Sequence, residues 1–212
     1  MAESAIIRLS MPSPVGHAIV GATIAWLAKP DESPTAGSSA DGRLQAMKAL
    51  KTTTVAAAFL AAAPDLDLIF PWTHRTASHS VTAVAVVCLL AILATRVTGQ
   101  VTGWSARRLV VLCTVAYASH LVLDWMAVDD TPPRGIQMLW PFSQAWFISG
   151  WDLFRGTARL GVFTAAAMRQ NVLAVIQETV MLAPIAWLVW SVRVKASTRF
   201  PAQMPGGHHS AE

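Results

Sequence analysis

Apolar and polar stretches alternate along the chain in a pattern typical of membrane helices. Five apolar segments cover about residues 14–28, 52–70, 80–95, 109–128 and 171–192. A membrane-spanning helix needs about 20 mostly apolar residues, and the second, fourth and fifth segments come close to that length. The pattern therefore predicts an all-α integral membrane protein, a helical bundle of about five segments.

The connections between these segments are polar or irregular. Residues 29–51 are rich in Ser, Asp, Gly and Lys and predict a solvated loop, and residues 96–108 predict another. The long connection over 129–170 contains several Trp residues, which favour membrane boundaries. This connection can therefore contain a helix that lies at the membrane interface. We expect residues 1–192 to form a single membrane domain and residues 193–212 to be a disordered tail.

The composition supports a membrane protein. Hydrophobic residues make up 54% of the chain and charged residues 13%, against a usual charged share of about 25%. The net charge of +4 does not indicate a nucleic-acid partner, because the basic residues do not cluster with aromatic residues. Cys88 and Cys113 lie inside apolar segments and form no CxxC pattern, so a thiolate zinc site is not predicted.

The densest polar cluster follows the second apolar segment, in the sequence APDLDLIFPWTHRTASHS. It contains Asp65 and Asp67, then His74, Arg75 and His79. Charge next to hydrocarbon is energetically costly and tends to mark function. This stretch is therefore the first candidate for a functional site.

Two other parts of the chain place similar residues on the same side of the membrane. If successive helices alternate in direction, His17 at the start of the first segment lies on the side of the cluster. His120 and Asp124 lie toward the same side in the fourth segment. Their i, i+4 spacing puts both on one helix face. Four helix ends therefore bring His and Asp residues to one membrane face, which predicts a metal site there.

The chemistry of these residues indicates the ion. Histidine and carboxylate ligands without cysteine suit zinc, and also manganese or iron. A bound divalent ion can lower the pKa of its water to about 7. Asp65 is then a candidate general base, and Arg75 a second catalytic candidate. The predicted metal ligands are His17, Asp65, Asp67, His74, His79, His120 and Asp124.

Each of these residues also has a plainer interpretation. The two aspartates can cap a helix or stabilise a turn. Arg75 can be a positive loop residue or an anchor to lipid phosphate, and His120 and Asp124 can form a buried hydrogen-bonded pair. Glu178, in the fifth segment, can face a lumen or a partner helix.

The motifs PDLDL, HRTASHS, SHLVLDW and GIQMLWPFS resemble the YdjM-like family of inner-membrane metal-dependent hydrolases. The resemblance covers about residues 15–142 and implies site roles for the predicted ligands, for Arg75 and Ser80, and for Pro141 and Phe142. Thr76 and Ser78 depart from the Gly and Thr usual in that family. The first departure bears on the turn, because Gly tolerates backbone angles that Thr does not.

The order of these motifs is also similar, more remotely, to the helical zinc-dependent phospholipases C. Those enzymes place an early His, a middle Asp, a further His and an HxxxD pair in the same order. The similarity implies hydrolysis of a phosphodiester or phospholipid.

These observations predict a membrane-bound metal-dependent hydrolase of a phosphoester or lipid-derived substrate. The alternatives are a membrane transporter of metal ions or protons, since intramembrane His and Asp also mark ion pathways, and a non-catalytic scaffold. The side opposite the site carries ten of the sixteen basic residues. The positive-inside rule then predicts a multi-pass inner-membrane protein with the site on the outer, periplasmic face. The sequence leaves the oligomeric state open.

Overall fold

The computed structural model describes residues 11–29, 40–69, 74–98, 104–159 and 161–195. Five α-helices account for most of them: α1 (Pro14–Ala28), α2 (Ala40–Ala62), α3 (Val81–Thr98), α4 (Ala106–Trp125) and α5 (Ala165–Trp190). Two short 3₁₀ helices, η1 (Ala63–Ile69) and η2 (Ala77–His79), separate α2 from α3, and a π-helical turn, η3 (Ser191–Lys195), extends α5. The described residues contain no strand, so the predicted all-α bundle is confirmed.

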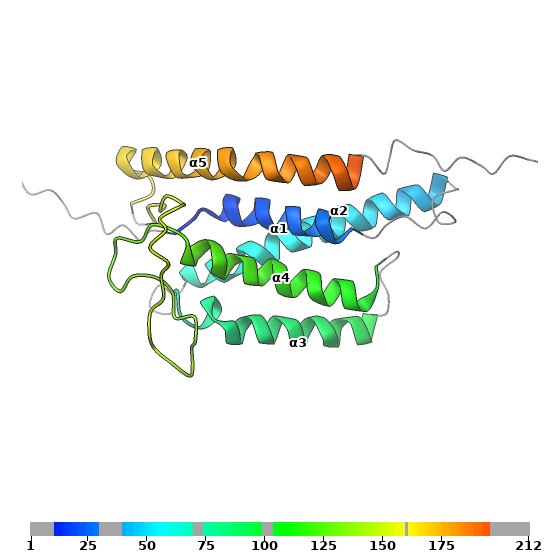
Figure 1. Cartoon of the computed structure of the whole chain (residues 1–212), viewed down its shortest axis with the longest axis horizontal. Coiled ribbons are helices and arrows are strands. Elements are labelled where there is room, and N and C mark those ends of the chain that lie inside the picture. The colour runs from blue at the N-terminus through cyan, green and yellow to red at the C-terminus, as the bar shows by residue number, and fades with distance from the viewer. Residues whose placement is uncertain (1–10, 30–39, 70–73, 99–103, 160, 196–212) are drawn as a thin grey trace, which may run out of the picture.

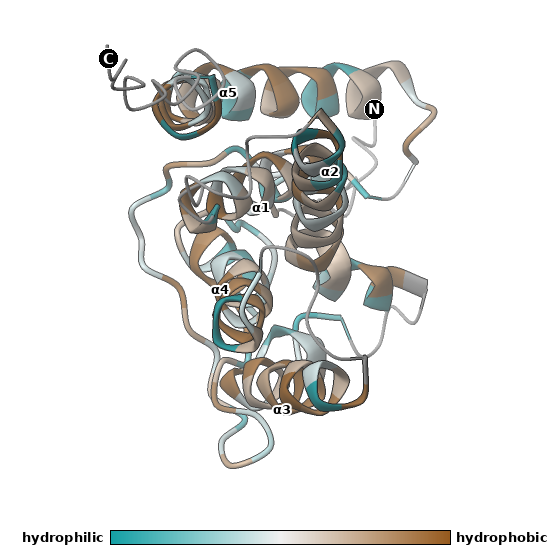
Figure 2. Ribbon diagram, turned by 90° about the vertical axis from the view of Figure 1, so that its right-hand side faces the viewer, coloured by the Kyte–Doolittle hydropathy of each residue, from teal (hydrophilic) through white to brown (hydrophobic). Residues whose placement is uncertain are grey.

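The helices lie side by side, with α1 at the centre of the arrangement (Figure 1). α1 packs against α2, α4 and α5, and α4 also packs against α2 and α3. Viewed from the end, α5 lies on one side of the bundle and α3 on the opposite side (Figure 2). The long connection between α4 and α5 covers the end where α1 begins and α4 finishes (Figure 1).

Local sequence signals set where the helices begin and how closely they pack. Ser13, Ser105 and Thr164 are the N-caps of α1, α4 and α5, and each side chain accepts a hydrogen bond from a backbone N–H of the first turn. Gly21 allows α1 to approach α2 closely. A Cβ atom there would meet the carbonyl of Ala57, so a small residue is required at this crossing.

Both predicted boundaries of the second segment are wrong. α2 begins at Ala40, inside the region predicted as a solvated loop, because Leu, Gln, Met, Ala and Lys are good helix formers even where the sequence is polar. α2 then ends at Ala62, before Pro64, and the last predicted residues of this segment form η1 instead. The change from polar to apolar residues near residue 51 therefore does not coincide with the start of α2.

The interfacial helix considered in the long connection is not found among the described residues of 126–164. The chain there is irregular and makes two isolated β-bridges, Ala127 with Phe154 and Ile136 with Phe147. α5 begins at Ala165, earlier than predicted. The predicted tail falls mostly outside the described residues, and its first three residues, 193–195, are helical in η3.

Two helices are long and apolar enough to cross a membrane, namely Ala106–Trp125 and Ala165–Lys195. Shorter apolar helices cover Pro14–Ala28 and Val81–Val97. Large apolar side chains on the outer faces of α3 and α5 are exposed, among them Leu89, Leu90, Val180 and Leu188. The hydropathy colouring shows much of both helices as hydrophobic (Figure 2). Exposed apolar faces of this extent are suited to contact with lipid.

Candidate metal centre

Polar side chains from separate parts of the chain meet at one end of the bundle. The long connection covers this end (Figure 1). His17 lies in the first turns of α1, and His120 and Asp124 lie in the last turns of α4. The others come from η1 and from the residues around η2. The structure brings together, in three overlapping groups, all seven predicted ligands: His17, Asp65, Asp67, His74, His79, His120 and Asp124.

Asp124 is the centre of the cluster, with three histidines around its carboxylate. Its Oδ1 lies 3.3 Å from Nε2 of His17, and its Oδ2 lies 3.1 Å from Nε2 of His120 and 3.3 Å from Nε2 of His79. The rings of His17 and His120 stack with their centroids 3.8 Å apart. All four side chains are buried. Three imidazoles and one carboxylate therefore converge on a small volume closed to solvent.

Hydrogen bonds on the far sides of two imidazole rings fix how the rings are turned. Nδ1 of His120 lies 2.8 Å from the carbonyl oxygen of Ala61, to which it donates. Nδ1 of His79 lies 3.3 Å from a carboxylate oxygen of Asp67. In both rings Nε2 is therefore directed at Asp124. Such outer hydrogen bonds commonly hold a metal-binding histidine in position.

Asp67 joins the two histidines of the η1–η2 region. Its Oδ1 lies 2.6 Å from Nδ1 of His74, and its Oδ2 accepts a hydrogen bond from the hydroxyl of Ser78. Nε2 of His74 is buried and makes no hydrogen bond. Asp67 thus bonds to His79 on the side of the ring that faces away from Asp124, which suits an orienting role. Asp67, His74 and His79 also form a possible ligand group of their own.

Asp65 is held by a residue that the sequence analysis did not single out. Arg159, in the long connection, donates from Nη2 to Oδ1 of Asp65 over 3.1 Å. The same carboxylate oxygen lies 3.9 Å from Nε2 of His120, and Oδ2 of Asp65 is buried without a hydrogen bond. Oδ1 of Asp65 therefore faces His120 and Arg159, and Oδ2 is free to bind a metal ion or accept a proton.

Arg75, the second catalytic candidate, lies in the turn between α2 and α3. Its guanidinium pairs with Asp129 and lies over the ring of Trp146, 5.5 Å from the centroid. It is only 4% exposed, so it is not a surface anchor for lipid. Within the described part of the chain it makes no ion pair or hydrogen bond with the cluster. It links the turn to the long connection.

The departure at Thr76 from the family motif has a simple explanation. The left-handed residue of the turn is Arg75, with φ of 65°, whereas Thr76 has φ of −113°. A residue at negative φ does not require glycine. The turn therefore forms with Thr at this position.

Glu178 is fully buried but belongs to a different feature. It reaches from α5 to the start of α1, where its carboxylate accepts hydrogen bonds from the backbone N–H of Ser13, at 2.7 Å, and from the Ser13 hydroxyl. No described ligand group includes it. It caps α1 one turn before His17, and so fixes the helix that carries this ligand.

Electrostatics in the metal-free cluster favour a positive charge. Burial alone would lower the pKa of His79, but the close contacts with Asp124 and Asp67 and the charges of both carboxylates raise it to about 9. Burial would raise the pKa of Asp67, but hydrogen bonds from His74 and His79 hold it well below its usual value. At neutral pH a proton on His79 therefore compensates the buried carboxylates.

The unsatisfied atoms test whether a metal ion fits. Nε2 of His17, Nε2 of His74, Oδ2 of Asp65 and both carboxylate oxygens of Asp124 are buried and make no hydrogen bond. Buried polar atoms are normally satisfied, and these are nitrogen and oxygen donors of the kind that zinc, manganese and iron accept. The residues present therefore fit a divalent ion.

Comparison with known proteins gives one match. A family model described as "YdjM inner membrane protein" matches residues 11–199, which include the whole cluster. Searches of curated proteins and of solved structures found no match.

Proposed function

The chain belongs to the YdjM inner membrane protein family, as its motifs predicted, and we propose that it is a membrane-bound metal-dependent hydrolase. The observation that supports the proposal most directly is the convergence of His17, His79 and His120 on the Asp124 carboxylate, with buried donor atoms left without hydrogen bonds. A cluster built only to stabilise the fold would be expected to satisfy these atoms.

The cluster provides two ways to hold divalent ions. His17, His120 and Asp124 form one ligand group, to which His79 adds a fourth donor, and Asp67, His74 and His79 form a second group. The absence of cysteine and the balance of nitrogen and oxygen favour zinc, with manganese or iron as alternatives. A divalent ion at such a centre acts as a Lewis acid and lowers the pKa of water toward about 7.

The chain's own residues would carry the proton and orient the substrate. Oδ2 of Asp65 is placed to accept a proton, and the hydrogen bond from Arg159 to Oδ1 holds this carboxylate in its orientation. Arg159 places a guanidinium charge directly beside Asp65, where it would attract a negatively charged group. This arrangement suits a phosphoester, whose charge needs a cationic partner.

A site at the end of the helices favours a substrate from the membrane surface. We propose that α1–α5 cross the membrane in alternating directions, with the cluster on the periplasmic face. The larger number of basic residues on the other side supports this orientation. A lipid-derived phosphoester could then reach the cluster from the membrane.

Metal analysis of the purified full-length protein tests the proposal. After expression with added metal, we expect about one or more equivalents of bound transition metal, because a site of this type should bind tightly. The same sample should hydrolyse members of a panel of phosphodiesters and phospholipids. His120→Ala should lose both properties, and Asp130→Asn, which alters an exposed carboxylate in the long connection, should keep them. Less than about a tenth of an equivalent, without activation by added metal, would refute the proposal.

A metal or proton transporter remains the second candidate, since the same residue types mark ion pathways. It would need polar side chains that continue to the other end of the bundle. There the described core is formed by apolar residues such as Ala25, Trp104 and Leu112, and Thr53 is the one buried polar side chain among the described residues of that half. Metal-dependent flux into liposomes that His120→Ala abolishes would favour the transporter.

A further inference from the structure

A basic pocket lies at the end of the bundle opposite the metal centre. It has a volume of about 510 Å³ and is lined by Lys29, Arg107, Arg108 and Arg193, with Ser105 beside them. Arg107 is 13 residues before His120 on α4, which corresponds to about 20 Å along the helix axis. The pocket is therefore separate from the cluster.

Three helices build this pocket. Lys29 follows the last residue of α1, Arg107 and Arg108 lie in the first turn of α4, and Arg193 belongs to η3 at the end of α5. Arg193 donates from Nη2 to the carbonyl oxygen of Lys29 over 2.9 Å, which ties the ends of α1 and α5 together. Among the described lining residues four are basic and none is acidic, and the side chains of Arg107 and Arg108 are exposed, which suits an anionic ligand.

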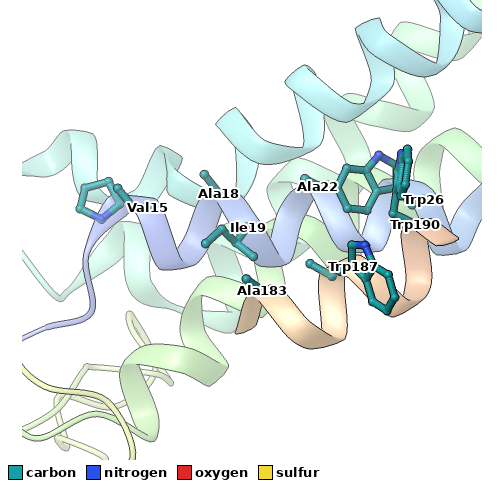
Figure 3. Close-up of a pocket in the computed structure, with 10 residues that line it drawn as sticks. Val15, Ala18, Ile19, Ala22, Trp26, Ala183, Trp187 and Trp190 are labelled. Carbon is teal, nitrogen blue, oxygen red and sulfur yellow. The ribbon is translucent and has the colours of Figure 1, made fainter. Parts of the chain in front are cut away.

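An apolar groove is formed by two of the same helices, α1 and α5 (Figure 3). It lies between α1 and α5 and has a volume of about 720 Å³. Trp26, Trp187 and Trp190 lie toward one end, and Val15 lies at the other (Figure 3). Trp26 is three residues before Lys29, and Trp190 is three residues before Arg193, so the tryptophan end is the end nearer the basic pocket.

The dimensions of the groove match an acyl chain. From Val15 to Trp26 α1 rises about 16 Å, and one leaflet contributes about half of the roughly 30 Å hydrocarbon core. Tryptophan favours the boundary between hydrocarbon and headgroups. The basic pocket, the tryptophans and the apolar groove therefore lie in the same spatial order as the headgroup, the glycerol region and the acyl chain of a phospholipid.

We propose that this surface binds an anionic phospholipid, with its phosphate in the basic pocket and one acyl chain in the groove between α1 and α5. Basic pockets between membrane helices on the cytoplasmic side are suited to acidic headgroups. A free phosphate ion would use the pocket but leave the groove unused. The lipid is a ligand on the face opposite the metal centre, so its binding is independent of the proposed hydrolysis.

Lipid binding to the full-length protein, delipidated in detergent, tests this proposal. The probes are phosphatidylglycerol and phosphatidylcholine with identical long acyl chains, measured by native mass spectrometry. We expect phosphatidylglycerol to bind at least about tenfold more tightly. Arg107→Gln/Arg108→Gln should weaken that binding by about fivefold for each charge removed, or about 25-fold in total. These side chains are exposed, so the variant should fold and keep the metal content of the wild type.

A matched control removes two charges outside the pocket. Arg96→Gln/Lys51→Gln changes exposed residues near the same end of the bundle, and we expect less than about a twofold effect on phosphatidylglycerol binding. Equal binding of the two lipids by the wild type would refute the proposal. An equal loss in the control variant would also refute it, because the effect would then come from net charge.

Two further measurements separate a lipid from a free anion. Phosphatidylglycerol with six-carbon chains should bind at least about tenfold more weakly than the long-chain lipid, because it buries fewer methylene groups. Ala22→Phe, which fills the groove, should weaken binding of the long-chain lipid only. If inorganic phosphate competes fully and chain length has no effect, the pocket is a phosphate site and the lipid assignment is wrong.

Discussion

Nε2 of His79 and Nε2 of His120 lie 3.0 Å apart in the buried centre of the cluster. Nδ1 of His120 donates to the carbonyl oxygen of Ala61, so in the neutral tautomer with this hydrogen bond Nε2 would carry a lone pair. Two such lone pairs facing each other would repel, and a proton or a cation must lie between them. In the metal-free protein the proton on His79 meets this need, and in the loaded protein a metal ion would.

The first prediction concerns the pH dependence of metal binding. Since the pKa of His79 is raised to about 9, its proton must leave before Nε2 can bind an ion. Apparent zinc affinity should therefore rise with pH, by up to about tenfold for each unit between pH 7 and pH 9. Asp67, whose pKa is held low, stays ionised in this range and adds no further dependence.

Calorimetric titration of the metal-free protein with buffered zinc, in buffers of different ionisation enthalpy, measures both the affinity and the released proton. His79→Gln should bind zinc more weakly and lose most of the pH dependence above pH 7. A wild-type affinity that is flat from pH 7 to pH 9, with no proton released, would show that His79 is not a ligand.

The second prediction compares two changes at Asp124. Asp124→Asn keeps the shape of the side chain but removes the charge that offsets the cation, so metal binding and activity should be lost while the protein still folds. Asp124→Ala should have the same effect on metal content. If His120 and Asp124 formed only a structural hydrogen bond, Asn would preserve activity and Ala would lower the free energy of unfolding by about 1–3 kcal/mol.

Metal content and thermal unfolding in detergent, measured on both variants, distinguish these cases. Normal metal content in Asp124→Asn would remove this residue from the site. Asp130→Asn serves as the control, because it makes the same chemical change at an exposed position.

The HxxxD pair could be predicted from the sequence because helix geometry determines it. Residues spaced i, i+4 on any regular helix share a face, so His120 and Asp124 had to lie together, and they do. The direction of each helix then placed His17 at the same end. Periodicity and alternation were sufficient for this half of the site.

The contacts made by the long connection could not be predicted in the same way. Arg159 bonds to Asp65, 94 residues away in the sequence, and Arg75 bonds to Asp129, 54 residues away. In each pair one partner lies in the long connection, which has no repeating pattern. The start of α2 was missed because polar residues with high helix propensity resemble a loop in composition. Tertiary contacts from irregular segments leave little trace in local sequence.

The third prediction separates a structural role of Arg75 from a catalytic one. Its guanidinium pairs with Asp129, and both side chains are buried. Removing one partner leaves a buried charge uncompensated, so Arg75→Ala and Asp129→Ala should each lower the free energy of unfolding by about 3–5 kcal/mol. Metal content per folded molecule should stay near that of the wild type in both.

Thermal unfolding, metal content and activity per folded molecule check this prediction. Arg155→Ala, an exposed arginine in the same connection, is the control and should change stability little. If Arg75→Ala abolishes activity in folded, metal-loaded protein while Asp129→Ala does not, Arg75 acts on the substrate and the structural account is wrong.

The fourth prediction concerns Asp67, which bonds to His74 and to Nδ1 of His79, the ring nitrogen that points away from Asp124. If Asp67 orients His79, its loss should weaken metal binding without abolishing it. Changes to such orienting partners commonly cost about 10–100-fold in metal affinity. Asp67→Asn keeps one acceptor oxygen and should lie at the lower end of that range, with Asp67→Ala at the upper end.

The comparison with Asp124 decides the role of Asp67. A carboxylate that binds the ion itself should give the same result at both positions, namely complete loss of metal on conversion to Asn. If Asp67 only orients His79, the Asp67→Asn variant should still bind zinc when the zinc concentration is raised. Its activity should then increase in proportion to the fraction of protein that has bound zinc. Zinc titration of Asp67→Asn and Asp124→Asn with parallel activity measurement therefore assigns Asp67 either to the ion or to the histidine that holds it.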